Sequence, residues 1–122
     1  MTMNKLRVLT TECRLLNLLR LGDNSKDGSD RVECVNKKGE SVKMSIKDIQ
    51  VVFGSYNLSG LEVATIDGDR MMIVRIGENG QETGSNIITC TYGGRTRKNI
   101  TIDQVEKFYG VYNFFNFKKG GW

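Results

Sequence analysis

Cations are the main candidate binding groups in this chain, and one reactive residue type is missing from the sequence. It contains no histidine, which removes Ser-His and Cys-His nucleophile pairs, imidazole bases and most zinc sites. Carboxylates remain, and Asp67 and Asp69 flank Gly68 as they do in a turn. Two carboxylates alone rarely complete a coordination sphere, so we interpret them as a turn, with a weak divalent-cation site as the alternative. We expect no catalytic residue, no metal site and no cofactor, and hence no enzyme.

The strongest candidate binding segment is residues 92–99, which combines cations, an aromatic ring and two glycines. Its proposed contacts are Tyr92, Arg95, Arg97 and Lys98. Cations contact phosphates and aromatic rings stack on bases in single-strand binding. Lys37, Lys38 and Lys43 occupy the corresponding region earlier in the chain. The sequence therefore predicts two basic hairpin tips that flank one nucleic-acid groove. The alternative is a solvated turn whose charges protect an edge strand from aggregation.

Three cysteines, Cys13, Cys34 and Cys90, stand far apart with no C-x-x-C pair. An odd number at this spacing favours reduced, mostly buried thiols in a reducing compartment.

Composition sets broad limits on the protein class. The 122 residues are 39% hydrophobic and 26% charged, with a net charge of +4. This composition predicts a folded domain or two very small ones, and it permits a polyanionic partner without requiring it. No apolar run is long enough to cross a bilayer, and the start lacks the apolar core of a signal peptide. We expect a cytoplasmic protein with no membrane partner, located in the host cytoplasm or the virion if it is phage-encoded.

The elements that carry these residues come as an internal repeat. Residues 6–24 align with 61–79, and 28–58 align with 84–114, so the offset changes by one residue inside a polar loop. Identities include Leu6/Leu61, Val8/Val63, Arg20/Arg75, Gly22/Gly77, Cys34/Cys90, Ile46/Ile102, Gly54/Gly110 and Tyr56/Tyr112. We interpret this as a tandem duplication with segments 1–58 and 59–114, followed by a tail, 115–122.

Each copy predicts two hairpins. The first pairs 6–10 with 15–21 and 61–65 with 71–76, although 11–21 alone also fits a short helix. In 71–76, alternation predicts that Met72, Val74 and Ile76 share one face. The second hairpin pairs 31–36 with 41–46 and 87–92 with 97–102. On these strands Cys34 and Cys90 share a face with Val32 and Ile88, so both thiols are predicted to lie in the core.

The apolar period then changes to i, i+3, i+6, i+7 and i+10, beginning at Ile46 and Ile102. With capping residues at Ser45 and Thr101 and stops at Gly54 and Gly110, this predicts a short amphipathic helix at the end of each copy. The fold class is therefore mainly β with short helices, built as two β-β-β-β-α units.

A unit of this size is close to the lower limit for independent folding. We expect the copies to pack about a pseudo-twofold axis and to share one core, with two independent units as the alternative. The residues predicted near the seam are Phe53, Tyr56, Phe108, Tyr109 and Tyr112.

Residues 87–108 contain a strand ending in Tyr92-Gly93, a return strand, and a closing turn with Ile102 and Val105. This pattern resembles the Tudor domain, and in the first copy Asn36-Lys37-Lys38-Gly39 replaces the Tyr-Gly-Gly turn. The resemblance implies a tandem SH3-like small β-barrel of the Tudor or KOW type. Tudor domains read methylated Lys or Arg through several aromatics, of which only Tyr92 has a counterpart here, so only the fold is carried over.

The tail is rich in aromatic residues that have no counterpart in the first copy. Phe115, Phe117 and Trp122 are predicted to dock on a protein partner or another subunit, because buried Trp residues are favoured interface anchors. We therefore expect a binding or assembly module that contacts nucleic acid through its basic tips. The alternative is a structural or protein-interaction subunit of a phage or mobile-element assembly that uses terminal aromatics and edge strands.

Overall fold

The structure is a computed structural model that describes residues 6–78 and 83–114. Within these ranges the chain is mainly β, with two antiparallel six-stranded sheets and two short 3-10 helices. No helix in the described ranges is long and apolar enough to cross a bilayer.

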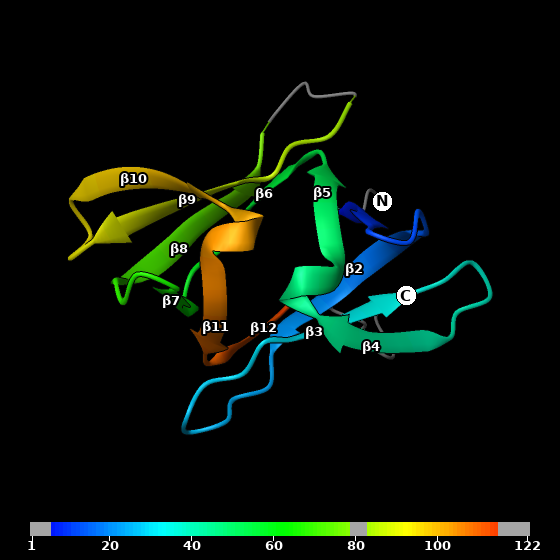
Figure 1. The fold of residues 1–122 in the computed structure, drawn as a ribbon, viewed down its shortest axis with the longest axis horizontal. Coiled ribbons are helices and arrows are strands. Elements are labelled where there is room, and N and C mark those ends of the chain that lie inside the picture. The colour runs from blue at the N-terminus through cyan, green and yellow to red at the C-terminus, as the bar shows by residue number, and fades with distance from the viewer. Residues whose placement is uncertain (1–5, 79–82, 115–122) are drawn as a thin grey trace, which may run out of the picture.

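The elements follow one another in the same order in both halves of the sequence (Figure 1). The first half contains β1 (Arg7–Thr10), β2 (Leu15–Gly22), β3 (Arg31–Val35), β4 (Ser41–Ser45), η1 (Ile46–Asp48), β5 (Ile49–Phe53) and β6 (Ser55–Asn57). The second half contains β7 (Glu62–Thr65), β8 (Arg70–Gly77), β9 (Ile87–Tyr92), β10 (Thr96–Thr101), η2 (Ile102–Gln104), β11 (Val105–Tyr109) and β12 (Val111–Asn113). The four predicted hairpins are confirmed, including the β1–β2 hairpin that competed with a helix.

The two sheets exchange their last strands. The first sheet has the order β4-β3-β2-β1-β5 and the second has β10-β9-β8-β7-β11. However, β6 from the first half pairs with β8, and β12 from the second half pairs with β2. Each sheet is therefore completed by a strand from the other half of the chain.

A second pair of reciprocal contacts holds the halves together. The backbone of Ser29, in the β2–β3 loop, bridges to Phe108 in β11, and that of Ser85, before β9, bridges to Val52 in β5. In each loop a glycine lies directly against the opposing strand. A Cβ on Gly28 would lie 2.9 Å from the Tyr109 ring, and one on Gly84 would lie 2.7 Å from Val51 Cγ2.

Glycines also allow two backbone segments to cross closely just before β6 and just before β12. Gly54 and Gly110, predicted as helix stops, instead precede β6 and β12. A Cβ on Gly77 would lie 2.0 Å from the Gly54 carbonyl oxygen, and one on Gly22 would lie 2.3 Å from that of Gly110. No side chain fits at either crossing, so both positions require glycine.

The chain enters and leaves the two sheets in equivalent ways. Leu58 donates its N–H to Val74 O at 3.2 Å, and Leu61 O accepts from Ile73 N at 2.9 Å, so the β6–β7 connection lies along β8. In the first sheet, Phe114 donates to Leu19 O at 2.8 Å and Leu6 O accepts from Leu18 N at 2.7 Å. Phe114 and Leu6 are thus placed along β2 as Leu58 and Leu61 are along β8.

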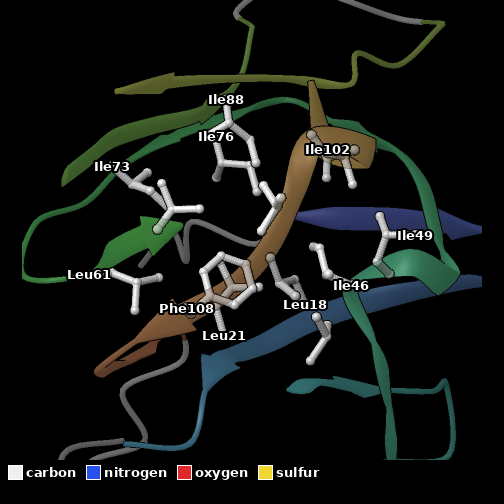
Figure 2. Close-up of a cluster of buried hydrophobic side chains, with 14 of the residues drawn as sticks. Leu18, Leu21, Ile46, Ile49, Leu61, Ile73, Ile76, Ile88, Ile102 and Phe108 are labelled. Carbon is white, nitrogen blue, oxygen red and sulfur yellow. The ribbon is translucent and has the colours of Figure 1, made fainter. Parts of the chain in front are cut away.

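One buried cluster takes side chains from both halves (Figure 2). Leu18, Leu21, Ile46 and Ile49 of the first half lie with Leu61, Ile73, Ile76, Ile88, Ile102 and Phe108 of the second. Burial of this apolar surface is the main force that favours the packed arrangement. Packing of η1 against η2 also contributes to this contact between the halves.

The helix predicted from Ile46 and from Ile102 is wrong. Each start is a three-residue 3-10 helix, and a strand follows immediately. In η1 the predicted capping box is present, with Ser45 N–H donating to Asp48 Oδ2 at 3.0 Å. The apolar pattern resembled a helix because β5 is covered on both faces, with Val52 in the core and Val51 and Phe53 against the Gly84 loop.

The face predicted for β8 is also wrong. Met71, Ile73 and Ile76 are buried, whereas Met72 is 38% exposed. A bulge between Ile73 and Arg75 shifts the alternation by one residue, as bulges generally do.

The aromatic residues predicted at the seam lie in contacts between the halves. Tyr56 of β6 and Tyr112 of β12 have ring centroids 6.0 Å apart, and Phe114 packs at 4.9 Å from Tyr56. Burial, and then the hydrogen bond with Tyr56, raises the pKa of Tyr112 to about 12. These edge-to-face contacts join the two exchanged strands.

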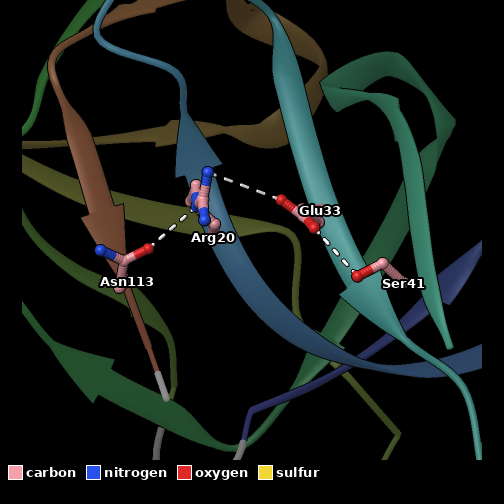
Figure 3. A network of polar contacts seen from close by, with 4 residues as sticks. All are labelled: Arg20, Glu33, Ser41 and Asn113. Carbon is pink, nitrogen blue, oxygen red and sulfur yellow. Dashed lines mark hydrogen bonds and ion pairs between the residues drawn. The ribbon is translucent and has the colours of Figure 1, made fainter. Parts of the chain in front are cut away.

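A polar network fixes β12 against the first sheet (Figure 3). Arg20 Nε donates to Asn113 Oδ1 at 2.9 Å, and Arg20 Nη1 lies 3.7 Å from Glu33 Oε1. Glu33 in turn accepts from Ser41 Oγ at 3.0 Å. In the second sheet Thr89 replaces Glu33, and the buried Nε of Arg75 has no partner among the described residues.

Candidate nucleic-acid interface

The candidate residues lie at two ends of the molecule that are defined by hairpin turns. In an antiparallel meander the first and third turns meet at the same edge of the sheet. The β1–β2 and β3–β4 turns form what we call the first end, and the β7–β8 and β9–β10 turns form the second end (Figure 1).

At the second end, the β9–β10 hairpin carries the predicted segment on an open tip. Gly93 and Gly94 adopt positive φ values of 57° and 78°, and no atom lies within 4 Å of a Cβ placed at either. Arg95 closes the turn by donating its N–H to Tyr92 O at 3.1 Å. Tyr92, which ends β9, is 38% exposed. The tip therefore gives a flat ligand access to both backbone and ring.

The cations of this hairpin differ in how far they are neutralised. Lys98 Nζ lies 3.6 Å from Asp69 Oδ2 in the β7–β8 turn. The side chains of Arg95 and Arg97 are exposed and have no ion pair or hydrogen bond within the described residues. Exposed ion pairs are weak, but Asp69 still reduces the positive potential around Lys98. Arg95 and Arg97 are thus the two cations of the tip that no described carboxylate neutralises.

Strand register divides these side chains between two faces. Tyr92 pairs with Thr96, and Lys98 pairs with Cys90, whereas Arg97 pairs with Thr91. Because successive residues of a strand point to opposite faces, Tyr92 and Lys98 share one face and Arg97 lies on the other. The hairpin is therefore suited to contact a strand that wraps around its tip.

At the first end, Lys37 and Lys38 lie in the β3–β4 turn, and Lys43 follows in β4 opposite Glu33. The turn is held by Asn36, whose Oδ1 accepts from the N–H groups of Lys38 and Glu40, both at 2.9 Å. All three lysines are exposed. These hydrogen bonds therefore fix the backbone from which the Lys37 and Lys38 side chains project.

Sequence analysis missed Arg14, which lies in the β1–β2 turn at the same end. It lines a hollow of about 350 Å³ with Lys37 and Lys38, and another of about 180 Å³ with Lys43. The predicted hairpins could have indicated this position, because two consecutive hairpins of one sheet place their turns at the same end. Arg14 and the three lysines form what we call the basic cluster, and the same two hollows are also lined by Glu12, Asp48 and Glu40.

The prediction that the two tips flank one groove is wrong. The β3–β4 and β9–β10 turns lie at opposite ends of the long axis of the molecule (Figure 1). Equivalent turns of the two halves point away from each other, with the shared core between them (Figure 1). The seven predicted side chains thus form two separate groups.

Two other groups of residues singled out from the sequence are the carboxylates of the β7–β8 turn and the cysteines. Asp67 and Asp69 lie in the β7–β8 turn, and the described residues contain no group of three His, Cys, Asp or Glu side chains placed to hold a metal ion. Cys34 and Cys90 are buried as predicted, but Cys13 is exposed. Burial, with a smaller effect of Glu33 that Arg14 opposes, raises the pKa of Cys34 to about 12. Burial raises the pKa of Cys90 to about 11, against the opposing charge of Lys98.

The predicted docking residues Phe115, Phe117 and Trp122 lie outside the described residues. Comparisons with protein families, curated proteins and solved structures find no significant match to this chain.

Proposed function

We propose that the chain is a tandem pair of SH3-like units that has kept a binding role and no catalytic one. Two features support the fold assignment. Each sheet runs as a four-strand meander whose first strand also pairs with the fifth, and a 3-10 helix stands between the fourth and fifth strands. The proposed duplication is further supported by the identical strand order of the two sheets.

The proposed ligand is nucleic acid, bound through the basic tips. The observation that carries this proposal is the second tip, where Arg95 and Arg97 have no partner among the described residues and Tyr92 presents its ring beside an open glycine turn. Cations without a protein carboxylate gain most from a phosphate, because they give up no existing ion pair. An adjacent ring adds stacking, which is worth about 1–3 kcal/mol per base.

The test is a titration of fluorescent single-stranded and duplex oligonucleotides at several salt concentrations. Affinity should fall steeply as salt rises, because bound phosphates release counterions. Arg95→Ala and Arg97→Ala should each reduce the salt slope by about 1. Tyr92→Ala should weaken single-strand binding without changing that slope. The matched control is Lys26→Ala, which removes an exposed cation from the β2–β3 loop, outside the four turns that define the ends. Binding that is absent or insensitive to salt refutes the proposal.

A second candidate is a protein-interaction or structural subunit, as in a phage or mobile-element assembly. It is favoured by the outer strands β4 and β10, each of which pairs with one neighbour only among the described strands. Free strand edges add a further strand from a partner. Association of this kind should tolerate salt, so the same titration distinguishes the two candidates.

A further inference from the structure

We infer that one protomer binds two separate nucleic-acid segments, one at each end, and so bridges them. This inference rests on the proposed function and specifies how the two basic groups are used. It comes from the opposite placement of the ends and from the basic cluster around Arg14 at the first end.

The first end has the composition of a phosphate-binding surface. Arg14, Lys37, Lys38 and Lys43 have no ion pair within the described residues. Two nearby carboxylates are already engaged by the fold, since Glu40 accepts from Asn36 Nδ2 at 2.9 Å and Asp48 accepts from the Ser45 N–H at 3.0 Å. Glu12 is the remaining carboxylate on the hollow that Arg14 and Lys43 line. Glu33, opposite Lys43, is engaged in the same way by Ser41 Oγ at 3.0 Å. These carboxylates keep their charge, but none of the four cations forms an ion pair with one of them within the described residues.

The packed contact region between the two halves separates the two ends. The shared core, the reciprocal loop bridges and the exchanged strands all lie between them. Two groups of cations on opposite sides of such a core do not converge on one short strand. A short oligonucleotide therefore occupies one end and leaves the other available.

Bridging is tested with two short oligonucleotides, one immobilised on beads and one fluorescent. The wild-type protein, held by the immobilised strand, should capture the fluorescent strand, and titration should give two strands per protomer. Lys37→Ala/Lys38→Ala removes cations from the first end and Arg95→Ala/Arg97→Ala from the second. Each variant should still bind the beads but lose capture, with a stoichiometry of one. These side chains are exposed and make no ion pair within the described ranges, so circular dichroism should confirm an unchanged fold.

The control is Lys26→Ala/Lys47→Ala, which removes the same charge from exposed positions in the β2–β3 loop and in η1, outside the four turns that define the ends. It should bridge as well as the wild type. Binding of one strand per protomer without capture overturns the bridging inference and leaves the proposed function intact. Capture that persists in both single-end variants also overturns it, because bridging would then arise from self-association. Failure of the wild type to bind either strand refutes the proposed function itself.

Discussion

The crossing of Gly77 over Gly54 makes the strand exchange testable by a single methyl group. In Gly77→Ala the new Cβ would lie 2.0 Å from the Gly54 carbonyl oxygen and 3.1 Å from Val52 Cγ2. Real Cβ atoms essentially never approach another heavy atom within 3.0 Å, so the backbone must shift by about 1 Å where β6 enters the second sheet. Overpacking of this kind costs about 1–3 kcal/mol, and a rigid backbone obstacle places the cost at the upper end.

Gly39→Ala is the matched control because Gly39 has the same φ of 84°, and no atom lies within 4 Å of the position that its Cβ would take. Both substitutions place an L-residue in the left-handed region, at a cost of about 1–2 kcal/mol. That shared cost cancels in the comparison. The difference between the two variants is therefore the collision alone, which we expect to be at least about 2 kcal/mol.

Urea unfolding followed by far-UV circular dichroism measures this difference, because the midpoint and slope together give the free energy of unfolding. Gly22→Ala, whose Cβ would lie 2.3 Å from the Gly110 carbonyl oxygen, should lose about as much as Gly77→Ala. Equal losses in Gly77→Ala and Gly39→Ala would refute the reciprocal exchange as described.

Further predictions concern the closed arrangement of the halves and the cysteines. A circular permutant would join Phe114 to Leu6 through Ser-Gly and open the chain between β6 and β7. We expect it to fold, as measured by circular dichroism and urea unfolding. A permutant that does not unfold cooperatively would contradict the equivalence of the two connections. Cys13 has a φ of 64° at the turn position that Gly68 occupies in the second half. Cys13→Gly should therefore raise the free energy of unfolding by about 1 kcal/mol. A lower free energy of unfolding in this variant would contradict this account of the turn. Above pH 9 the thiols of Cys34 and Cys90 ionise in the unfolded chain but stay protonated in the folded one, because their folded pKa values are raised. The free energy of unfolding should therefore fall as pH rises from 9 to 11, by at most about 1.4 kcal/mol per pH unit for each thiol. The fall is smaller for Cys90 as the pH approaches its folded pKa of about 11. A slope unchanged in Cys34→Ala would exclude that thiol as a source.

The hairpins were predictable because their signals are local. Turn residues and β-branched runs mark each one, and the Asp67-Gly68 turn of the second half resolved the helix-like stretch of the first. The strand exchange was not predictable in the same way. A three-residue strand such as β6 has no local feature that specifies which sheet it joins, and the close approach of Gly54 to Gly77 is seen only in the structure.

For the candidate site, the sequence predicted that the turn cations would be exposed but not how they are distributed. Their assignment to one groove required the relative orientation of the halves, which local sequence signals do not specify. Arg14 is distant in sequence from Lys37, and the predicted hairpins indicate that the two are neighbours only when both hairpins are placed side by side in one sheet. Exposure is thus a local property, whereas grouping depends on topology.

The two halves have identical residues at several of the positions where they meet and different residues at their ends. Val8 and Val63 are both fully buried and identical. At the turns, by contrast, Asn36 of the first half corresponds to Tyr92 of the second, and neither turn of the first end contains an aromatic residue. Because the exchanged strands and the shared core lie between the ends, substitutions at the tips cost the fold little, and each tip is free to acquire its own ligand preference. Under the proposed function, the first end would therefore bind phosphates of any strand through charge alone, whereas the ring of Tyr92 at the second end would favour unpaired bases.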